Sequence, residues 1–116
     1  KIPAFYNVFP ELNHNEMTGL DVKSSSRTLS RNFAFLLLPD RSDHPRIQKR
    51  MQMLGKLYRD RGLPVQEVDL KGKSAFHKIF SSLVLADWAA FYTAKQYGLE
   101  AEQVPMVEEF KKLIAR

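Results

Sequence analysis

The stretch Phe33-Ala34-Phe35-Leu36-Leu37-Leu38 is an unbroken apolar run, and Pro39-Asp40 ends it. A strand with one face in water alternates apolar and polar residues, whereas a strand covered on both faces is apolar throughout. The run therefore predicts a central strand of a parallel sheet, buried on both faces.

A helix is expected directly after this strand, near residues 44–61. Asp43 or His44 can cap it, Pro45 fits its first turn, and Gly62 ends it. Its apolar residues recur at spacings of three and four, which places them on one face of a helix. They are Ile47, Met51, Leu54 and Tyr58.

The segment Val65 to Leu70 has the composition of a second strand. Its polar residues Gln66, Glu67 and Asp69 indicate a more exposed position than that of the first strand. A strand, a helix and a strand in so short a stretch favour a crossover between parallel strands, and such crossovers are right-handed by strong default. The fold class predicted from the residues is therefore α/β.

A long helix is expected from Ser74 to Tyr97, with Gly98 at its end. Its middle, from Ile79 to Tyr92, is apolar on nearly every side, and a helix of that kind is buried. In so small a chain, only a partner chain or a further part of the same domain could cover it completely. We therefore expect an assembly.

The last helix is expected to start at Pro105. Lys111 falls near the edge of its apolar stripe, whereas Lys112 points the other way. Lys111 is thus predicted to lie near the protein body; taken alone, the pattern favours a lysine stem that merely covers apolar surface. The stripe consists of Val107, Phe110, Leu113 and Ile114.

Composition restricts the class of protein. The chain has 116 residues, 44% of them hydrophobic, which is enough for one small domain. It has no cysteine, so it has neither disulfides nor thiolate metal sites, and a reducing cytoplasm is the expected location. No apolar run approaches the roughly 20 residues of a membrane span, and no signal peptide is recognisable.

The net charge of +5 raises the question of nucleic-acid binding. Basic residues concentrate between Arg41 and Arg61, but Tyr58 is the only aromatic residue among them, so base stacking has little support. The pattern favours a solvated helix face. The histidines show no metal-ligand spacing and no glycine-rich phosphate loop is present, so we expect no metal and no nucleotide cofactor.

The window Phe9 to Glu16 carries the densest chemistry of the chain. It is expected to open a helix from about Pro10 to Thr18, ended by Gly19 and followed by a loop from Asp21 to Ser30. A histidine exchanges protons near pH 7, and neighbouring carboxylates and amides can orient its ring. An ordinary helix start with solvated side chains is an equally open interpretation. The polar residues are Glu11, Asn13, His14, Asn15 and Glu16.

The stretch from Lys1 to Glu16 resembles the bifunctional phosphoglucose/phosphomannose isomerase family of archaea and bacteria. Three later segments agree: Asp40 to Arg46, which contains His44-Pro45-Arg46, then Leu83 to Gly98, and Val104 to Lys111. The resemblance covers nearly the whole chain, as the C-terminal sugar isomerase (SIS) domain. It implies a three-layer, flavodoxin-like parallel sheet with flanking helices, of which residues 1–116 would be an incomplete C-terminal part of a longer chain with two SIS domains.

The resemblance also implies a reaction. Such enzymes interconvert glucose 6-phosphate or mannose 6-phosphate with fructose 6-phosphate through a cis-enediol, without a metal or cofactor. His14 matches the histidine that opens the sugar ring, and Lys111 matches the lysine near the ring oxygen. The window's other polar residues are expected to have supporting roles: Glu11, Asn13, Asn15 and Glu16.

The same resemblance limits what this chain does alone. The family's catalytic glutamate and phosphate-binding Ser/Thr cluster lie before Lys1, so we expect the isolated chain to be inactive. Val104 stands where some members have threonine, which leaves the mannose activity less secure. A homodimer with its active site near the subunit interface is expected. A sugar-phosphate-binding regulatory SIS module, or a structural half that dimerises, remain the alternatives.

Overall fold

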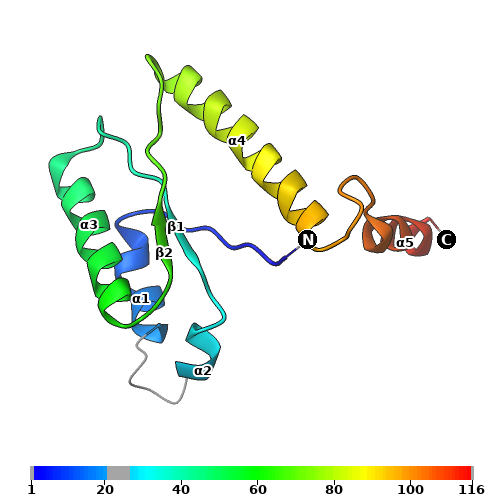
Figure 1. The fold of residues 1–116 in the computed structure, drawn as a ribbon, viewed down its shortest axis with the longest axis horizontal. Coiled ribbons are helices and arrows are strands. Elements are labelled where there is room, and N and C mark those ends of the chain that lie inside the picture. Colours follow the sequence, from blue (N-terminus) through cyan, green and yellow to red (C-terminus); the bar gives the residue numbers. More distant parts are fainter. Residues whose placement is uncertain (1, 21–26, 116) are drawn as a thin grey trace. The chain divides into compact units, whose positions relative to one another are not determined.

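The computed structural model describes residues 2–20 and 27–115 (Figure 1). They form two compact units, and each is described by itself. The strand unit is Ala4–Ser81, and the helical unit is Ser82–Arg116 together with Lys1–Pro3. The elements in chain order are η1 (Glu11–Asn13), α1 (Asn15–Gly19), α2 (Arg27–Ser30), β1 (Phe35–Leu37), α3 (Pro45–Asp60), β2 (Val65–Glu67), α4 (Ala75–Gln96) and α5 (Pro105–Ile114).

The two strands β1 and β2 are parallel neighbours, as predicted, and Phe35 pairs with Val65. Both strands are shorter than the segments predicted for them, residues 33–38 and 65–70. Backbone pairing nevertheless continues beyond them, because the amide N–H of Leu70 donates to the carbonyl of Pro39 at 3.0 Å. The mixed helix and strand content with a small parallel sheet fits an α/β domain.

Helix α3 packs against the sheet through the predicted stripe. Leu54 and Tyr58 are buried, and the ring of Tyr58 lies 4.5 Å from that of Phe35 between centroids. Gly55 lets the helix approach closely, since a Cβ there would meet the Leu37 side chain at 3.1 Å. The core of the strand unit therefore lies between α3 and one face of the sheet.

Within the described residues only one face of the first strand is covered, so cover on both faces stays a prediction. Leu37 is 8% exposed beneath α3, but Leu36, which points to the opposite face, is 60% exposed. Alternate residues of a strand face opposite sides, so a single packed helix covers only every second side chain. One face of β1 remains apolar and uncovered.

The helix ends follow local chemistry that was visible in the sequence. His44 caps α3, and its Nδ1 accepts the backbone N–H of Arg46 at 3.2 Å. The glycines expected to end α3 and α4 both have positive φ, 76° at Gly62 and 65° at Gly98. Such backbone conformations favour glycine, which explains why the helices stop there. The predicted bounds of α3 and α4 and the predicted start of α5 are confirmed within one residue.

The apolar residues of α4 are exposed rather than buried. Ala94 is its only buried residue among those the structure describes, whereas Phe80 is 63% and Trp88 55% exposed. Coverage of this helix by another chain stays a prediction. Among the described residues, no helix has both the length and the apolar character needed to cross a membrane.

The polar window does not form the single helix expected from Pro10 to Thr18. It forms the 3₁₀ turn η1 and the short helix α1, which are separated at His14. The predicted loop is also wrong in part, because Arg27–Ser30 form the short helix α2. The rest of that loop, residues 21–26, lies outside the described residues.

Candidate functional site

His14 occupies the junction between η1 and α1. Its backbone leaves helical geometry, with φ −101° and ψ −100°. Its N–H donates to the carbonyl of Glu11 at 3.1 Å, and its carbonyl accepts the Thr18 hydroxyl at 3.3 Å. His14 thus ends one short helix and begins the next, and it remains exposed.

The imidazole of His14 has a specific partner. Its Nδ1 lies 3.1 Å from Oδ1 of Asn15. An amide oxygen only accepts hydrogen bonds, so Nδ1 must carry the proton in this contact. The neutral ring then leaves Nε2 as its acceptor nitrogen. An exposed imidazole with one nitrogen in contact with a neighbouring amide is suited to general acid–base chemistry.

The other predicted residues of the window take different positions. The carboxylate of Glu16 accepts a hydrogen bond from the Asn7 side-chain amide, which ties α1 to the extended segment before it. Glu11 is exposed in the first turn of η1, where its negative charge interacts favourably with the N-terminal end of the helix dipole. The structure thus brings His14 and Asn15 together and uses Glu16 to hold the segment.

Two buried polar atoms near this window have no hydrogen-bond partner among the described residues. They are Oδ1 of Asn13 and the hydroxyl of Tyr58. Burial, and then the negative charge of Glu16, raise the pKa of Tyr58 to about 12, so its hydroxyl stays neutral. The sequence pattern predicted the apolar position of Tyr58 but not the burial of its hydroxyl. A tyrosine on an apolar stripe could have indicated it, because a buried tyrosine hydroxyl usually has a hydrogen-bond partner.

Lys111 lies on α5, in the helical unit. Its Nζ is 2.9 Å from Oε1 of Glu108, one helical turn earlier, and its side chain is 62% exposed. The expectation that Lys111 is held near the protein body stays a prediction, since α5 is described only within its own unit. His14 belongs to the strand unit, so each of the two predicted catalytic residues is placed only within its own unit.

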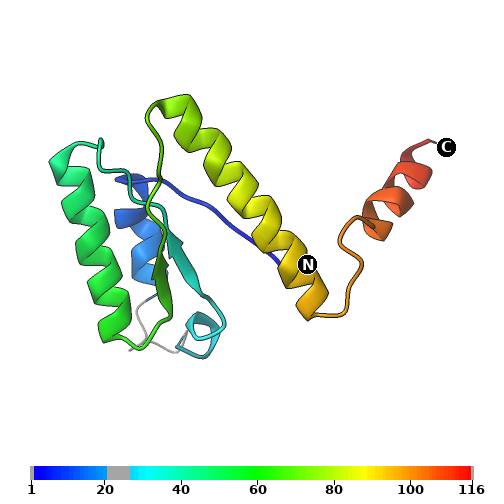
Figure 2. The same cartoon turned by 45° about the horizontal axis from the view of Figure 1, so that its top comes forward.

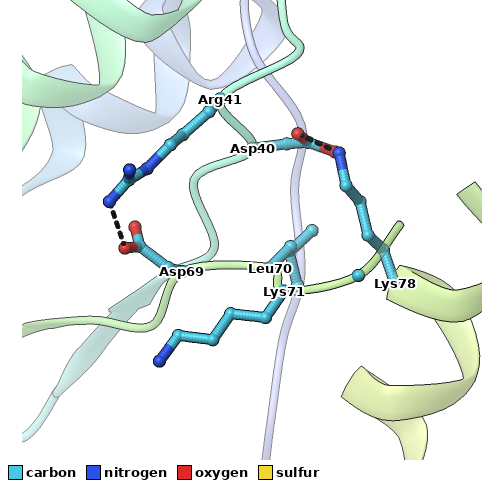
Figure 3. Close-up of a pocket in the computed structure, with 7 residues that line it drawn as sticks. Asp40, Arg41, Asp69, Leu70, Lys71 and Lys78 are labelled. Atoms are coloured by element: carbon cyan, nitrogen blue, oxygen red, sulfur yellow. Dashed lines mark hydrogen bonds and ion pairs between the residues drawn. The ribbon is translucent and has the colours of Figure 1, made fainter. Parts of the chain in front are cut away.

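A second group of polar side chains meets at the carboxyl ends of β1 and β2 (Figure 3). Nζ of Lys78 lies 2.6 Å from Oδ1 of Asp40, and this ammonium, together with the N–H and hydroxyl of Ser42, holds the pKa of Asp40 at about 2. Arg41 lies 3.3 Å from Asp69. From the sequence, Asp40 was assigned to the end of a strand and to a segment that resembles the family. Its contact with Lys78 was missed, although parallel strands bring their carboxyl ends to one edge.

No group of three or more histidine, cysteine or carboxylate side chains suited to a metal ion occurs in the described part of the chain. The arrangement around His14 offers proton transfer by an imidazole and hydrogen bonding by amides. The side chains at the carboxyl ends of β1 and β2 provide fixed charges of both signs.

Comparison with known proteins gives a consistent result. Residues 1–114 match the family model of the bacterial phospho-glucose isomerase C-terminal SIS domain. A bifunctional phosphoglucose/phosphomannose isomerase of Aquifex aeolicus is 30% identical over 97% of this chain and 34% of its own length. Proteins of the same name from Caldicellulosiruptor bescii and Thermoplasma volcanium are both 31% identical over 99% of this chain, and over 33% and 35% of their own lengths.

The chain thus spans about a third of the curated relatives it matches. No solved structure matches it significantly. The family model extends over almost every residue, from the segment before η1 to the end of α5. The chain belongs to the family of bacterial phospho-glucose isomerase C-terminal SIS domains.

Proposed function

We propose that this chain is the C-terminal SIS part of an aldose–ketose isomerase that converts glucose 6-phosphate and mannose 6-phosphate to fructose 6-phosphate. The observation that carries the proposal is the family match over residues 1–114. The relatives' names, which specify phosphoglucose and phosphomannose isomerases, support this substrate class. Because the chain spans only a third of them, the activity is proposed for the longer protein.

His14 is proposed to open the sugar ring. The Asn15 amide oxygen holds the proton on Nδ1, so Nε2 can take a proton from the anomeric hydroxyl and return one to the ring oxygen. The open-chain aldehyde then isomerises as a carboxylate moves a proton between C2 and C1 through a cis-enediol. Glu11 and Glu16 are supporting residues in this scheme. The carboxylate that moves the proton is proposed to belong to another part of the longer protein.

Lys111 is proposed to lie beside the ring oxygen and stabilise the negative charge that develops there. Its present partner, Glu108, is exposed, and an exposed ion pair contributes little free energy. The lysine is therefore free to exchange this carboxylate for substrate. Asn13 is proposed to support the neighbouring His14, with its buried oxygen available to a hydrogen-bond donor.

The assembled enzyme is proposed to be a homodimer with a three-layer SIS sheet and its active site near the subunit interface. Two apolar surfaces support this. Leu36 is exposed on the open face of β1, and Phe80 and Trp88 are exposed on α4. Exposed apolar residues at this density are typical of surfaces that bind other protein elements.

Paired lysine variants in the full-length protein test the proposal. Lys111→Ala should lower kcat/KM for fructose 6-phosphate by about 10²-fold, as the loss of one charge-stabilising donor does. Lys112→Ala, its exposed neighbour, is the matched control and should retain wild-type activity. Equal effects of the two substitutions would contradict the role of Lys111. Sugar-phosphate binding without any turnover would indicate a regulatory module instead.

A further inference from the structure

The hollow at the carboxyl ends of β1 and β2 contains none of the residues proposed to take part in isomerisation. It has a volume of about 360 Å³, within the range of small-molecule sites. Open parallel sheets bind ligands beyond the carboxyl ends of their strands, where the loops converge. Its lining residues are Asp40, Arg41, Asp69, Leu70, Lys71, Gly72 and Lys78.

Two of the charged groups in this hollow neutralise each other. Asp40 and Lys78 form a pair at 2.6 Å, and each side chain is only 19% exposed. Asp40 also accepts the N–H of Ser42 at 2.8 Å and its hydroxyl at 2.7 Å. This ordered pair joins the loop after β1 to the first turns of α4, so it is a structural element of the hollow.

The loop after β2 is also held close to the start of α4. A Cβ at Gly72 would lie 2.8 Å from the backbone nitrogen of Lys78, so only glycine permits this approach. The start of α4 is capped, because Oγ of Ser74 accepts the N–H of His77 at 3.2 Å. The backbones that carry Arg41 and Lys71 are therefore both fixed against α4.

The remaining charges of the hollow are Arg41, Asp69 and Lys71. Arg41 is 88% exposed and uses one nitrogen to contact Asp69 at 3.3 Å, which leaves most of its five N–H donors available. Lys71 makes no ion pair with any described residue. In Figure 3 the side chains of Arg41 and Lys71 extend to the same side as Asp69, away from Lys78. Three cations face two carboxylates, so one positive charge is uncompensated.

We propose that this hollow binds a small tetrahedral oxyanion, a phosphate group, through Arg41 and Lys71. A guanidinium presents paired N–H groups that match two oxygens of a phosphate, and an ammonium adds a point charge. The contact between Arg41 and Asp69 is long and exposed, so a phosphate can share or replace it. Inorganic phosphate and a phosphate monoester of a sugar carry the same recognised group.

The test is a titration of the ¹⁵N-labelled protein with inorganic phosphate, fructose 6-phosphate and fructose at constant ionic strength. Phosphate and fructose 6-phosphate should shift the amide signals of Arg41, Lys71 and Gly72, whereas fructose should not. Equal affinity for the two phosphates would identify the phosphate group as the sole ligand. Tighter binding of fructose 6-phosphate would identify a sugar phosphate as the ligand.

Charge variants make the test specific. Arg41→Gln and Lys71→Gln should each weaken binding about 10-fold, the loss expected when one charge-assisted hydrogen bond is removed. Lys73→Gln, in the same loop but outside the hollow, should bind as wild type. The proposal is overturned if no shifts appear, or if Lys73→Gln weakens binding as much as the other two, since that is general surface attraction. The readout uses neither His14 nor Lys111, so failure of the isomerase proposal leaves this result unaffected.

Discussion

Tyr58 combines a core position with an unused polar group. Its ring packs against Phe35, and its hydroxyl is buried without a hydrogen-bond partner in the described residues. A buried polar group without a partner costs about 1–3 kcal/mol of stability. The ring therefore stabilises the strand unit while the hydroxyl weakens it.

Tyr58→Phe should consequently be neutral or raise the free energy of unfolding by up to about 1 kcal/mol. The pKa of Tyr58 is raised from 10.0 to about 12, so at alkaline pH the unfolded chain ionises first and stability falls as pH rises from about 10. The Phe variant has no hydroxyl to ionise, so its free energy of unfolding should exceed that of the wild type by a growing margin above pH 10. Urea unfolding at pH 7 and pH 11 measures both effects; a Phe variant that is clearly less stable at pH 7 would show that the hydroxyl is satisfied.

Asp40 gives the opposite pH dependence. Its pKa is lowered from 3.8 to about 2 by Lys78 and Ser42, so the ionised form is favoured in the folded protein. The stabilisation is complete above pH 4 and is lost as pH falls towards 2. Asp40→Asn should lower the unfolding midpoint at pH 5 and bring the two proteins closer together at pH 2. If the unfolding midpoints of the two proteins differ by the same amount at every pH, this ion pair is not a source of stability.

Individual site residues were predictable only where the sequence places them side by side. His14 and Asn15 are adjacent, and their contact in the structure follows from that. The contact between Arg41 and Asp69 spans 28 positions and depends on how two strands align, so no local pattern announces it. The unpartnered hydroxyl of Tyr58 likewise depends on packing from other elements.

At the scale of elements, helix α3 was predicted well because its signals are local. The His44 cap, the apolar stripe and Gly62 are all read within the helix and its ends. The break at His14 was missed, because a proline and polar residues at a helix start are compatible with one helix or two short ones. The first strand was predicted too long, since an apolar run marks burial rather than sheet hydrogen bonding.

Gly55 tests how closely α3 approaches the sheet. Gly55→Ala should be near neutral, because a gain in helix propensity of about 0.5–1 kcal/mol is offset by crowding against Leu37 at 3.1 Å. Gly55→Leu should destabilise by about 1–3 kcal/mol through overpacking. Gly19→Ala, which meets nothing within 4 Å, is the control for added volume. Thermal unfolding midpoints measure these effects. If Gly55→Leu leaves the midpoint unchanged, the contact between α3 and Leu37 is loose.

At the scale of the whole molecule, the described residues leave much apolar surface in solvent. Trp88, Phe91 and Tyr92 form an aromatic cluster on α4 with ring centroids 5.6–5.9 Å apart, and all three are at least 40% exposed. The sequence predicted that this helix needs cover, because its apolar residues surround it. It could not specify which element or chain supplies the cover.

Trp88→Asp should therefore shift the full-length protein from dimer to monomer, because a carboxylate cannot be buried unpaired in an apolar interface. Gln96→Asp, at the end of the same helix, introduces the same charge and should leave the dimer intact. Light scattering of the purified proteins measures the mass. A monomeric wild-type protein would refute the predicted assembly.

The proposed role of His14 in opening the sugar ring is tested by comparing cyclic and open-chain substrates. Turnover by wild-type and His14→Ala full-length enzyme is measured with a cyclic sugar phosphate and with an analogue fixed in the open-chain form. His44→Ala, which alters a helix cap, is the control. His14→Ala should slow turnover of the cyclic substrate by about 10²–10⁴-fold, the range of general acid–base catalysis, and turnover of the open-chain analogue far less. Wild-type activity of His14→Ala on the cyclic sugar, or an equal defect on both substrates, would contradict it.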